Sequence, residues 1–153
     1  MIALSDLREG GKVCDNAVVT VKTFVFGDLV VAEEAPERGV GLVAETRAAD
    51  CRVLYLLSGR GLWAAFRNLR PARPGEVKGS VEQTVADLLA LFHASEMEFA
   101  VLPEEGFRLA IIHGAITPEP IDRLRESLGS RLTSCIMRPQ GMRRIRTVVE
   151  FRP

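Results

Sequence analysis

Histidine and cysteine are the side chains that most often bind transition metals, and this chain has few of them. The two histidines, His93 and His113, stand twenty positions apart, and no cysteine lies near either of them in the sequence. Metal sites need such ligands in clusters at short spacing, so the sequence predicts no metal site. The three cysteines, Cys14, Cys51 and Cys135, form no C-x-x-C pair, and we expect them to be reduced thiols.

Nucleophilic catalysis needs a serine or cysteine with a base and an orienting acid. Ser58, Ser134 and Cys135 are not enclosed by a G-x-S-x-G pattern. We therefore predict no catalytic residue and a protein that is not an enzyme. An enzymatic alternative requires a deep pocket that joins His93 or His113 to an acid, whereas the surrounding sequence indicates structural or surface histidines.

The segment 39–44 reads G-V-G-L-V-A and matches the G-x-G-x-x-A pattern, in which glycines let a backbone approach a pyrophosphate. Its context does not fit a nucleotide site, because residues 33–38 form an acidic loop rather than a strand. No acid stands about twenty residues further on, and no P-loop pattern is present. The sequence therefore predicts no cofactor.

The composition is that of a folded protein. The chain has 153 residues, of which 47% are hydrophobic and 26% charged, with 20 basic and 20 acidic side chains. No run approaches the ~18 apolar residues of a membrane span. Residues 1–11 do not have a basic start followed by an apolar stretch, so we expect no signal peptide and a cytoplasmic location.

Charge is unevenly distributed along the chain. The net charge is −4 over residues 28–50, +4 over 60–78, −6 over 80–105 and +5 over 121–153. On one interpretation, the acidic and basic blocks face one another within one molecule or are solvated. On the other, a basic face binds a polyanion or an acidic protein. The pI of 6.7 favours the first interpretation, because nucleic-acid-binding domains usually have a pI above ~9.

Turn residues divide the chain into two parts. We predict a first domain over residues 1–73, a proline- and glycine-containing linker over 74–79, and a second domain over 80–153. Short apolar runs in the first part indicate strands over 17–26, 29–32, 40–44, 52–57 and 62–66. Their spacing of about ten residues favours a small, bent β-barrel, closed by a tight turn over 68–71.

The second part has helical and strand periodicity in alternation. Ser80 precedes an apolar stripe with Gln83 three positions later, so we predict a capped helix over 81–94. A hairpin over 97–111 follows, then a second helix that begins at Thr117-Pro118 and is capped by Gly129. Strands over 132–137 and 145–151 complete an αββαββ unit. We therefore predict an α+β protein with a four-stranded antiparallel sheet.

The first part resembles a known type of domain. The runs F-V-F-G-D-L-V-V (24–31), G-V-G-L-V (39–43) and R-V-L-Y-L (52–56), followed by Trp63 and Asn68-Leu69, resemble SH3-like barrels of the KOW and Tudor kind. The polymerase-interacting domain of CarD-type transcription regulators is similar in its G-D-x-V-V and G-V-G-x-V steps. The resemblance covers residues 23–73, and it implies a barrel that binds protein or nucleic acid. Residues 80–153 resemble no family.

Two surfaces are candidates for binding. The first is an aromatic platform for a protein partner, formed by Tyr55, Trp63 and Phe66 and flanked by Arg60 and Arg67. On this interpretation the protein is a non-enzymatic adaptor or regulator. The alternative is that Trp63 covers the end of the barrel and contributes to its core.

The second surface lies near the C-terminus and fits a nucleic acid. Its arginines are Arg143, Arg144, Arg146 and Arg152, and alternation places the last three on the face of a strand opposite the apolar residues. A homo-oligomer is a further expectation, because the acidic strip 80–105 complements the arginine-rich end and an open sheet edge invites strand addition.

Overall fold

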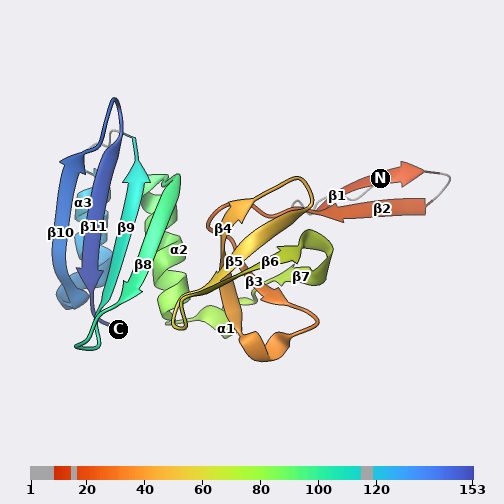
Figure 1. The fold of residues 1–153 in the computed structure, drawn as a ribbon, viewed down its shortest axis with the longest axis horizontal. Coiled ribbons are helices and arrows are strands. Elements are labelled where there is room, and N and C mark those ends of the chain that lie inside the picture. Colours follow the sequence, from red (N-terminus) through yellow and green to blue (C-terminus); the bar gives the residue numbers. More distant parts are fainter. Residues whose placement is uncertain (1–8, 15–16, 115–118) are drawn as a thin grey trace.

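The computed structural model describes residues 9–14, 17–114 and 119–153. The chain is an α+β protein with two antiparallel sheets and a separate hairpin (Figure 1). The hairpin pairs β1 (Glu9–Cys14) with β2 (Ala17–Lys22), so the run predicted over 17–26 ends four residues early. In the described part of the chain no helix has both the length and the apolar character needed to cross a membrane.

The first sheet has five strands in the order β6-β5-β4-β3-β7. The elements of this region are β3 (Leu29–Ala32), η1 (Pro36–Arg38), β4 (Val40–Thr46), β5 (Asp50–Tyr55), β6 (Arg60–Ala65), η2 (Phe66–Asn68) and β7 (Leu69–Pro71). The segment predicted as a tight turn over 68–71 is thus mostly a short edge strand, a position that tolerates Pro71. β3 pairs with both β4 and β7, and the described strands do not close into a barrel.

Each face of this sheet packs into a different core. Residues at alternate positions, such as Val53 and Tyr55 of β5, point to an inner core that also receives Phe24, Phe66 and Leu69. Leu54 and Leu56 point the other way. Gly41 of β4 makes room for this packing, because a Cβ there would lie 2.3 Å from Val53 Cγ1.

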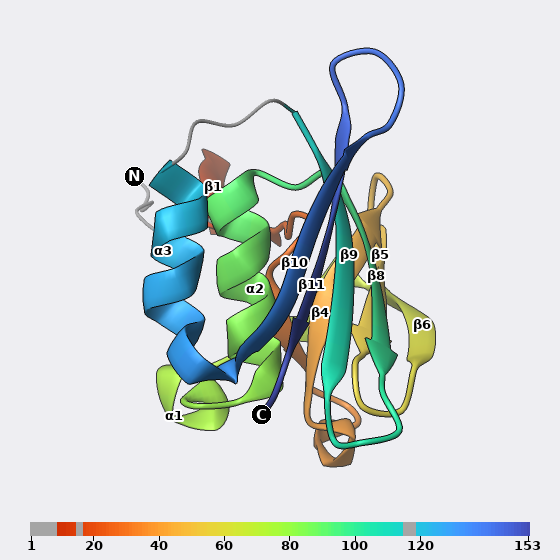
Figure 2. The same cartoon turned by 90° about the vertical axis from the view of Figure 1, so that its left-hand side faces the viewer.

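The second sheet has four strands in the order β10-β11-β9-β8. They are β8 (Glu96–Val101), β9 (Phe107–His113), β10 (Leu132–Pro139) and β11 (Ile145–Phe151), with α3 (Glu119–Leu128) and η3 (Gly129–Arg131) before β10. The predicted αββαββ order and antiparallel sheet are confirmed, and the helices lie on one face of the sheet (Figure 2). The expected helix start at Thr117-Pro118 lies outside the described residues, while Gly129 has the expected positive φ of 52°.

Helix α2 (Val81–Phe92) lies between the two sheets (Figure 1). Its N-terminus is capped as predicted, because Ser80 Oγ accepts a hydrogen bond from Gln83 N at 3.2 Å. The helix ends at Phe92, two residues before the predicted end, where His93 adopts a left-handed conformation. Leu88 and Leu89 of α2 belong to one core cluster with Leu42 and Leu56 from the first sheet and Leu109 from the second. One helix therefore joins both sheets through a shared core.

The segment predicted as a linker begins with a short helix, α1 (Pro74–Val77). Glu76 accepts two hydrogen bonds from the Arg70 guanidinium, at 2.8 and 2.9 Å, and one from Arg73 N at 2.8 Å. These bonds stabilise the carboxylate and lower the pKa of Glu76 from its ordinary value of 4.5 to about 2. A bidentate ion pair thus holds α1 against β7.

Candidate functional site

The predicted aromatic platform is not assembled on the surface. Tyr55 and Phe66 are only 9% and 7% exposed and lie in the inner core of the five-stranded sheet. In the β5–β6 ladder Tyr55 stands opposite Arg60, whereas Trp63 stands opposite Arg52. Because successive side chains point to opposite faces of a strand, Tyr55 and Trp63 project from different faces. The two buried aromatic rings are therefore unavailable for stacking on a partner.

Trp63 remains on the surface, where it is 43% exposed. The Arg47 guanidinium carbon lies 3.5 Å from the centroid of the Trp63 ring, a cation–π contact. Arg47 is held in turn by an ion pair with Asp50, whose Oδ1 accepts from Nε at 3.0 Å. The ring thus has one face in contact with a cation and part of its surface open to solvent.

Arg52 is a second arginine beside Trp63. It stands opposite Trp63 in the ladder, and its Nε donates to Glu45 at 3.2 Å. Its side chain extends over Gly61, where a Cβ would lie 2.3 Å from Arg52 Nη1. The glycine in β6 therefore leaves the space that this guanidinium occupies.

Among the described strands β6 pairs only with β5, so it is a free edge of the sheet, and the two predicted arginines bracket it. Arg60 begins β6 and Arg67 lies in the turn that follows it, and both side chains are exposed. Phe66 N donates to Ala49 O at 3.0 Å, and the register continues without a shift along β6. Since hydrogen-bonding direction alternates along a strand, the peptide groups of Gly61, Trp63 and Ala65 point outward from the edge.

Sequence reasoning missed Arg47 and Arg52 as members of this surface. The contact between Arg47 and Trp63 joins residues sixteen positions apart, and it depends on the β4–β5 turn and the β5–β6 register. The signal available in the sequence is the pair Arg47 and Asp50, spaced three residues apart in a turn.

The predicted nucleic-acid-binding arginines do not form one patch. Arg143, Arg144, Arg146 and Arg152 are all exposed, as expected. However, Arg152 follows the far end of β11, and Arg144 is held in an ion pair with Glu96 of β8. This pair joins the acidic strip to the arginine-rich end within one molecule, as one of the two interpretations of the charge blocks predicts.

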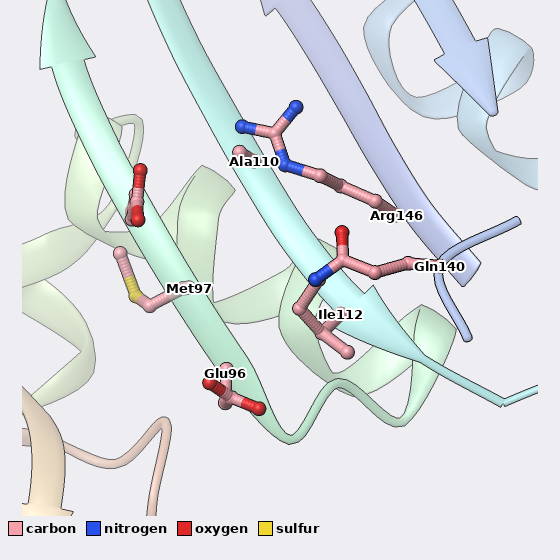
Figure 3. Close-up of a pocket in the computed structure, with 7 residues that line it drawn as sticks. Glu96, Met97, Ala110, Ile112, Gln140 and Arg146 are labelled. Atoms are coloured by element: carbon pink, nitrogen blue, oxygen red, sulfur yellow. The ribbon is translucent and has the colours of Figure 1, made fainter. Parts of the chain in front are cut away.

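Arg146 borders a shallow hollow of about 130 Å³ on the helix-free face of the four-stranded sheet (Figure 3). Ala110 and Ile112 of β9 form its floor, Arg146 and Gln140 lie on one side, and Glu96 lies on the other (Figure 3). Arg146 stands opposite Ile112 in the ladder, and Ile112 stands opposite Glu96. The arginine surface is therefore interrupted by carboxylates, which weakens its attraction for a polyanion.

His113 is a structural residue of the core. It is 2% exposed, its ring lies 5.1 Å from that of Phe92, and Nε2 is 2.5 Å from the hydroxyl of Thr147. Nδ1 lies 2.7 Å from Gly114 O, which can only accept, so Nδ1 donates. Both ring nitrogens are thus occupied by internal hydrogen bonds.

His93 is exposed at the end of α2, in an open hollow with Asp87 and Arg123. Among the described residues no group of three or more His, Cys, Asp or Glu side chains is placed to hold a metal ion. Cys51 is fully buried, and this burial, followed by the charges of Asp50 and Asp28, raises the pKa of its thiol to about 11. Cys51 is therefore protonated near neutral pH.

Comparisons with protein-family models, with curated proteins and with solved structures returned no match. The candidate site is consequently defined by geometry alone. Its members are the exposed Trp63, the outward peptide groups of β6, and the arginines at positions 47, 52, 60 and 67.

Proposed function

We propose that this chain is a cytoplasmic, non-catalytic adaptor or regulatory protein that binds an acidic, extended segment of a partner protein along β6. The observation that carries the proposal is Trp63, an exposed tryptophan on a free strand edge. Tryptophan is enriched at the centres of protein interfaces because it buries a large area when a partner covers it.

The interpretation of the first sheet as SH3-like fits this role. Its last strand, β7, returns to pair with its first, β3, and all five strands contribute residues to the inner core. Such a return makes a sheet strongly bent, which is the arrangement expected of a small barrel. SH3-like domains generally bind other macromolecules through an exposed surface. The exposed Trp63 would form part of such a surface here.

The edge of β6 suits an extended segment. Outward peptide groups at Gly61, Trp63 and Ala65 offer donors and acceptors in the pattern that an added strand needs. Main-chain pairing supplies affinity, and the neighbouring side chains supply specificity. The Trp63 ring would then cover the side chains of the added strand.

The charge near β6 selects an acidic segment. Arg60 and Arg67 are exposed at the two ends of the strand, and no ion pair joins either of them to another described residue. Arg47 and Arg52 are each paired with one acid, so the local balance remains basic. Carboxylates of a partner would pair with the free guanidinium groups.

The experiment uses Trp63 as its own reporter, because it is the only tryptophan of the chain. A peptide of about ten residues with alternating Glu and Val is titrated while tryptophan fluorescence is followed. We expect a saturable change in fluorescence, and no change with a matched peptide of alternating Lys and Val. Equal responses to both peptides would contradict the proposal.

The substitution Ala65→Pro tests strand pairing specifically. Ala65 has φ −69°, which proline adopts without strain, and its N–H points away from β5. One lost main-chain hydrogen bond costs about 0.5–1.5 kcal/mol, so we expect a fall in peptide affinity of about 2- to 13-fold. Met142→Ala, an exposed apolar position between β10 and β11 of the other sheet, is the control. Unchanged binding by Ala65→Pro would exclude pairing at this edge.

An oligonucleotide titration tests the nucleic-acid alternative. A single-stranded oligonucleotide that binds without displacing the acidic peptide, with an affinity that falls steeply as salt is added, would favour the arginines at 143, 144 and 146, which lie on the other sheet.

A further inference from the structure

We propose that a second copy of this chain pairs with β10, so that the two four-stranded sheets join across a two-fold axis at Ile136. The strands run antiparallel, and Ile136 of one copy lies opposite Ile136 of the other. This interaction surface is separate from β6 and does not depend on the proposed peptide site.

The first step of the argument is that β10 is a long free edge. It has eight residues and pairs only with β11 among the described strands. Figure 2 shows β10 as the strand nearest the viewer, bordered by α3. An edge of this length presents a row of free peptide groups that can template another strand.

The second step is a comparison with the other free edges. β8 carries the exposed acids Glu96 and Glu98, β6 has the exposed Arg60 at its start, and β7 has only three residues and ends in Pro71. Charges, prolines and shortness are the usual devices that prevent edge pairing. β10 ends in Arg138 and Pro139 and its register shifts between Leu132 and Ser134. The run 134–137 between these features is S-C-I-M and contains no charge or proline.

The third step fixes the register. Gln140 N donates to Arg144 O at 2.9 Å, and the register then continues unshifted from Pro139 to Ser134. By alternation, Ile136 and Arg138 bond to β11, while the peptide groups of Cys135 and Met137 point outward. A two-fold axis at Ile136 pairs Cys135 with the second copy's Met137, and both outward groups are satisfied.

The fourth step concerns the side chains that would meet. Ile136 is 48% exposed on the helix-free face. In this register it forms a pair without direct hydrogen bonds, in which the Cα atoms are about 4.5 Å apart and the side chains are close. Arg138, which no ion pair joins to another described residue, would lie opposite Ser134 of the second copy. Glu150, which neighbours that serine and already pairs with Arg108 of its own chain, would be within reach of Arg138.

The helical face is also complementary to itself. Figure 2 shows α3 beside β10. Partial burial raises the pKa of the Cys135 thiol, and the Arg125 guanidinium of α3 partly offsets this effect. Asp122 and Arg125 are three residues apart and so share one face of α3. Since the two-fold axis runs the two α3 helices in opposite directions, it can set the acid of one copy against the base of the other.

The first test is the oligomeric state. Light scattering at micromolar concentration should give a mass of twice 16.8 kDa for the wild-type chain and for Ile136→Val. Ile136→Lys places a charge at the centre of the interface and should give a monomer with an unchanged circular dichroism spectrum. A wild-type monomer, or a dimer that survives Ile136→Lys, would overturn the proposal.

The second test is cross-linking, which also reads the register. Ile136→Cys is made with Cys14 and Cys135 replaced by serine, and Val25→Cys in the same background is the matched control. A Cα separation near 4.5 Å permits a disulfide, so we expect mild oxidation to link Ile136→Cys but not the control. A link through native Cys135 in the wild-type chain and none through position 136 in the variant, or equal links in Ile136→Cys and Val25→Cys, would contradict the two-fold axis at Ile136.

Discussion

Strands β6 and β10 are both free edges among the described strands, yet their side chains suit different partners. β6 carries Trp63 and is bracketed by Arg60 and Arg67, so two copies of it would bring like charges together. The middle of β10 is uncharged and has Ile136 at its centre. Free peptide groups therefore allow an edge strand to pair, while the charge of its side chains determines which partner strand it pairs with.

The two sheets behind these edges share one helix, which is the basis for the largest expected effect. Leu88 of α2 is 2% exposed and belongs to the core cluster that includes residues of both sheets. Leu88→Ala should destabilise the protein by about 2–5 kcal/mol, because a cavity remains where the side chain was. Urea unfolding followed by Trp63 fluorescence reports on the first sheet, and far-ultraviolet circular dichroism reports on the whole chain.

A shared core predicts that both signals shift together in Leu88→Ala. If the circular dichroism midpoint moves while the fluorescence midpoint does not, the two sheets unfold independently. That result would contradict a shared core and show that the sheets belong to separate domains.

Gly41 tests how tightly the inner core of the five-stranded sheet is packed. A Cβ at this position would meet Val53 Cγ1 at 2.3 Å and Tyr55 Cε1 at 3.0 Å. Gly41→Ala should therefore cost about 1–3 kcal/mol through overpacking. Gly75→Ala in α1 has nothing within 4 Å of the added atom and is the control. Equal unfolding free energies for the two variants would show that the inner core tolerates an added methyl group.

The smallest expected effect concerns the ion pair between β7 and α1. The folded chain keeps Glu76 charged to about pH 2, while the ordinary pKa of the carboxyl is 4.5. A carboxyl whose pKa is lowered by folding adds stability above its unfolded pKa and loses that contribution as pH falls. Glu76→Gln should therefore be less stable than the wild type at pH 7, and the difference should vanish as pH falls from about 4.5 to about 2.

Urea midpoints at pH 7, 4 and 2.5 measure this difference. Glu34→Gln is the matched control, because Glu34 is exposed and no ion pair joins it to another described residue. A difference between Glu76→Gln and the wild type that does not depend on pH would show that the effect comes from packing of α1.

The sequence was a good guide where the pattern is local. Ser80 and the apolar stripe after it predicted α2, and the alternation around residues 97–111 and 132–151 predicted the strands of the second sheet. These signals are local because capping and periodicity involve residues a few positions apart. The separate strand β7 and the pairing of β1 with β2 were missed, because short strands gain their stability from partners that are distant in the sequence.

The binding surface was predicted only in part for the same reason. Arg60, Trp63 and Arg67 lie at the surface as expected, but Tyr55 and Phe66 are core residues. The residues next to an aromatic residue in a strand do not show which face of the sheet its side chain lies on, because a shift of one residue in register exchanges the two faces.

Composition and periodicity by themselves determined that this chain forms an α+β protein with an αββαββ second part, because hydrophobic spacing limits which elements can bury their apolar faces. Only the tertiary structure decided that α2 joins both sheets in one core, that Arg47 stacks on Trp63, and which peptide groups of β6 and β10 face outward. These features depend on strand register and on contacts between distant residues, which a linear pattern does not contain.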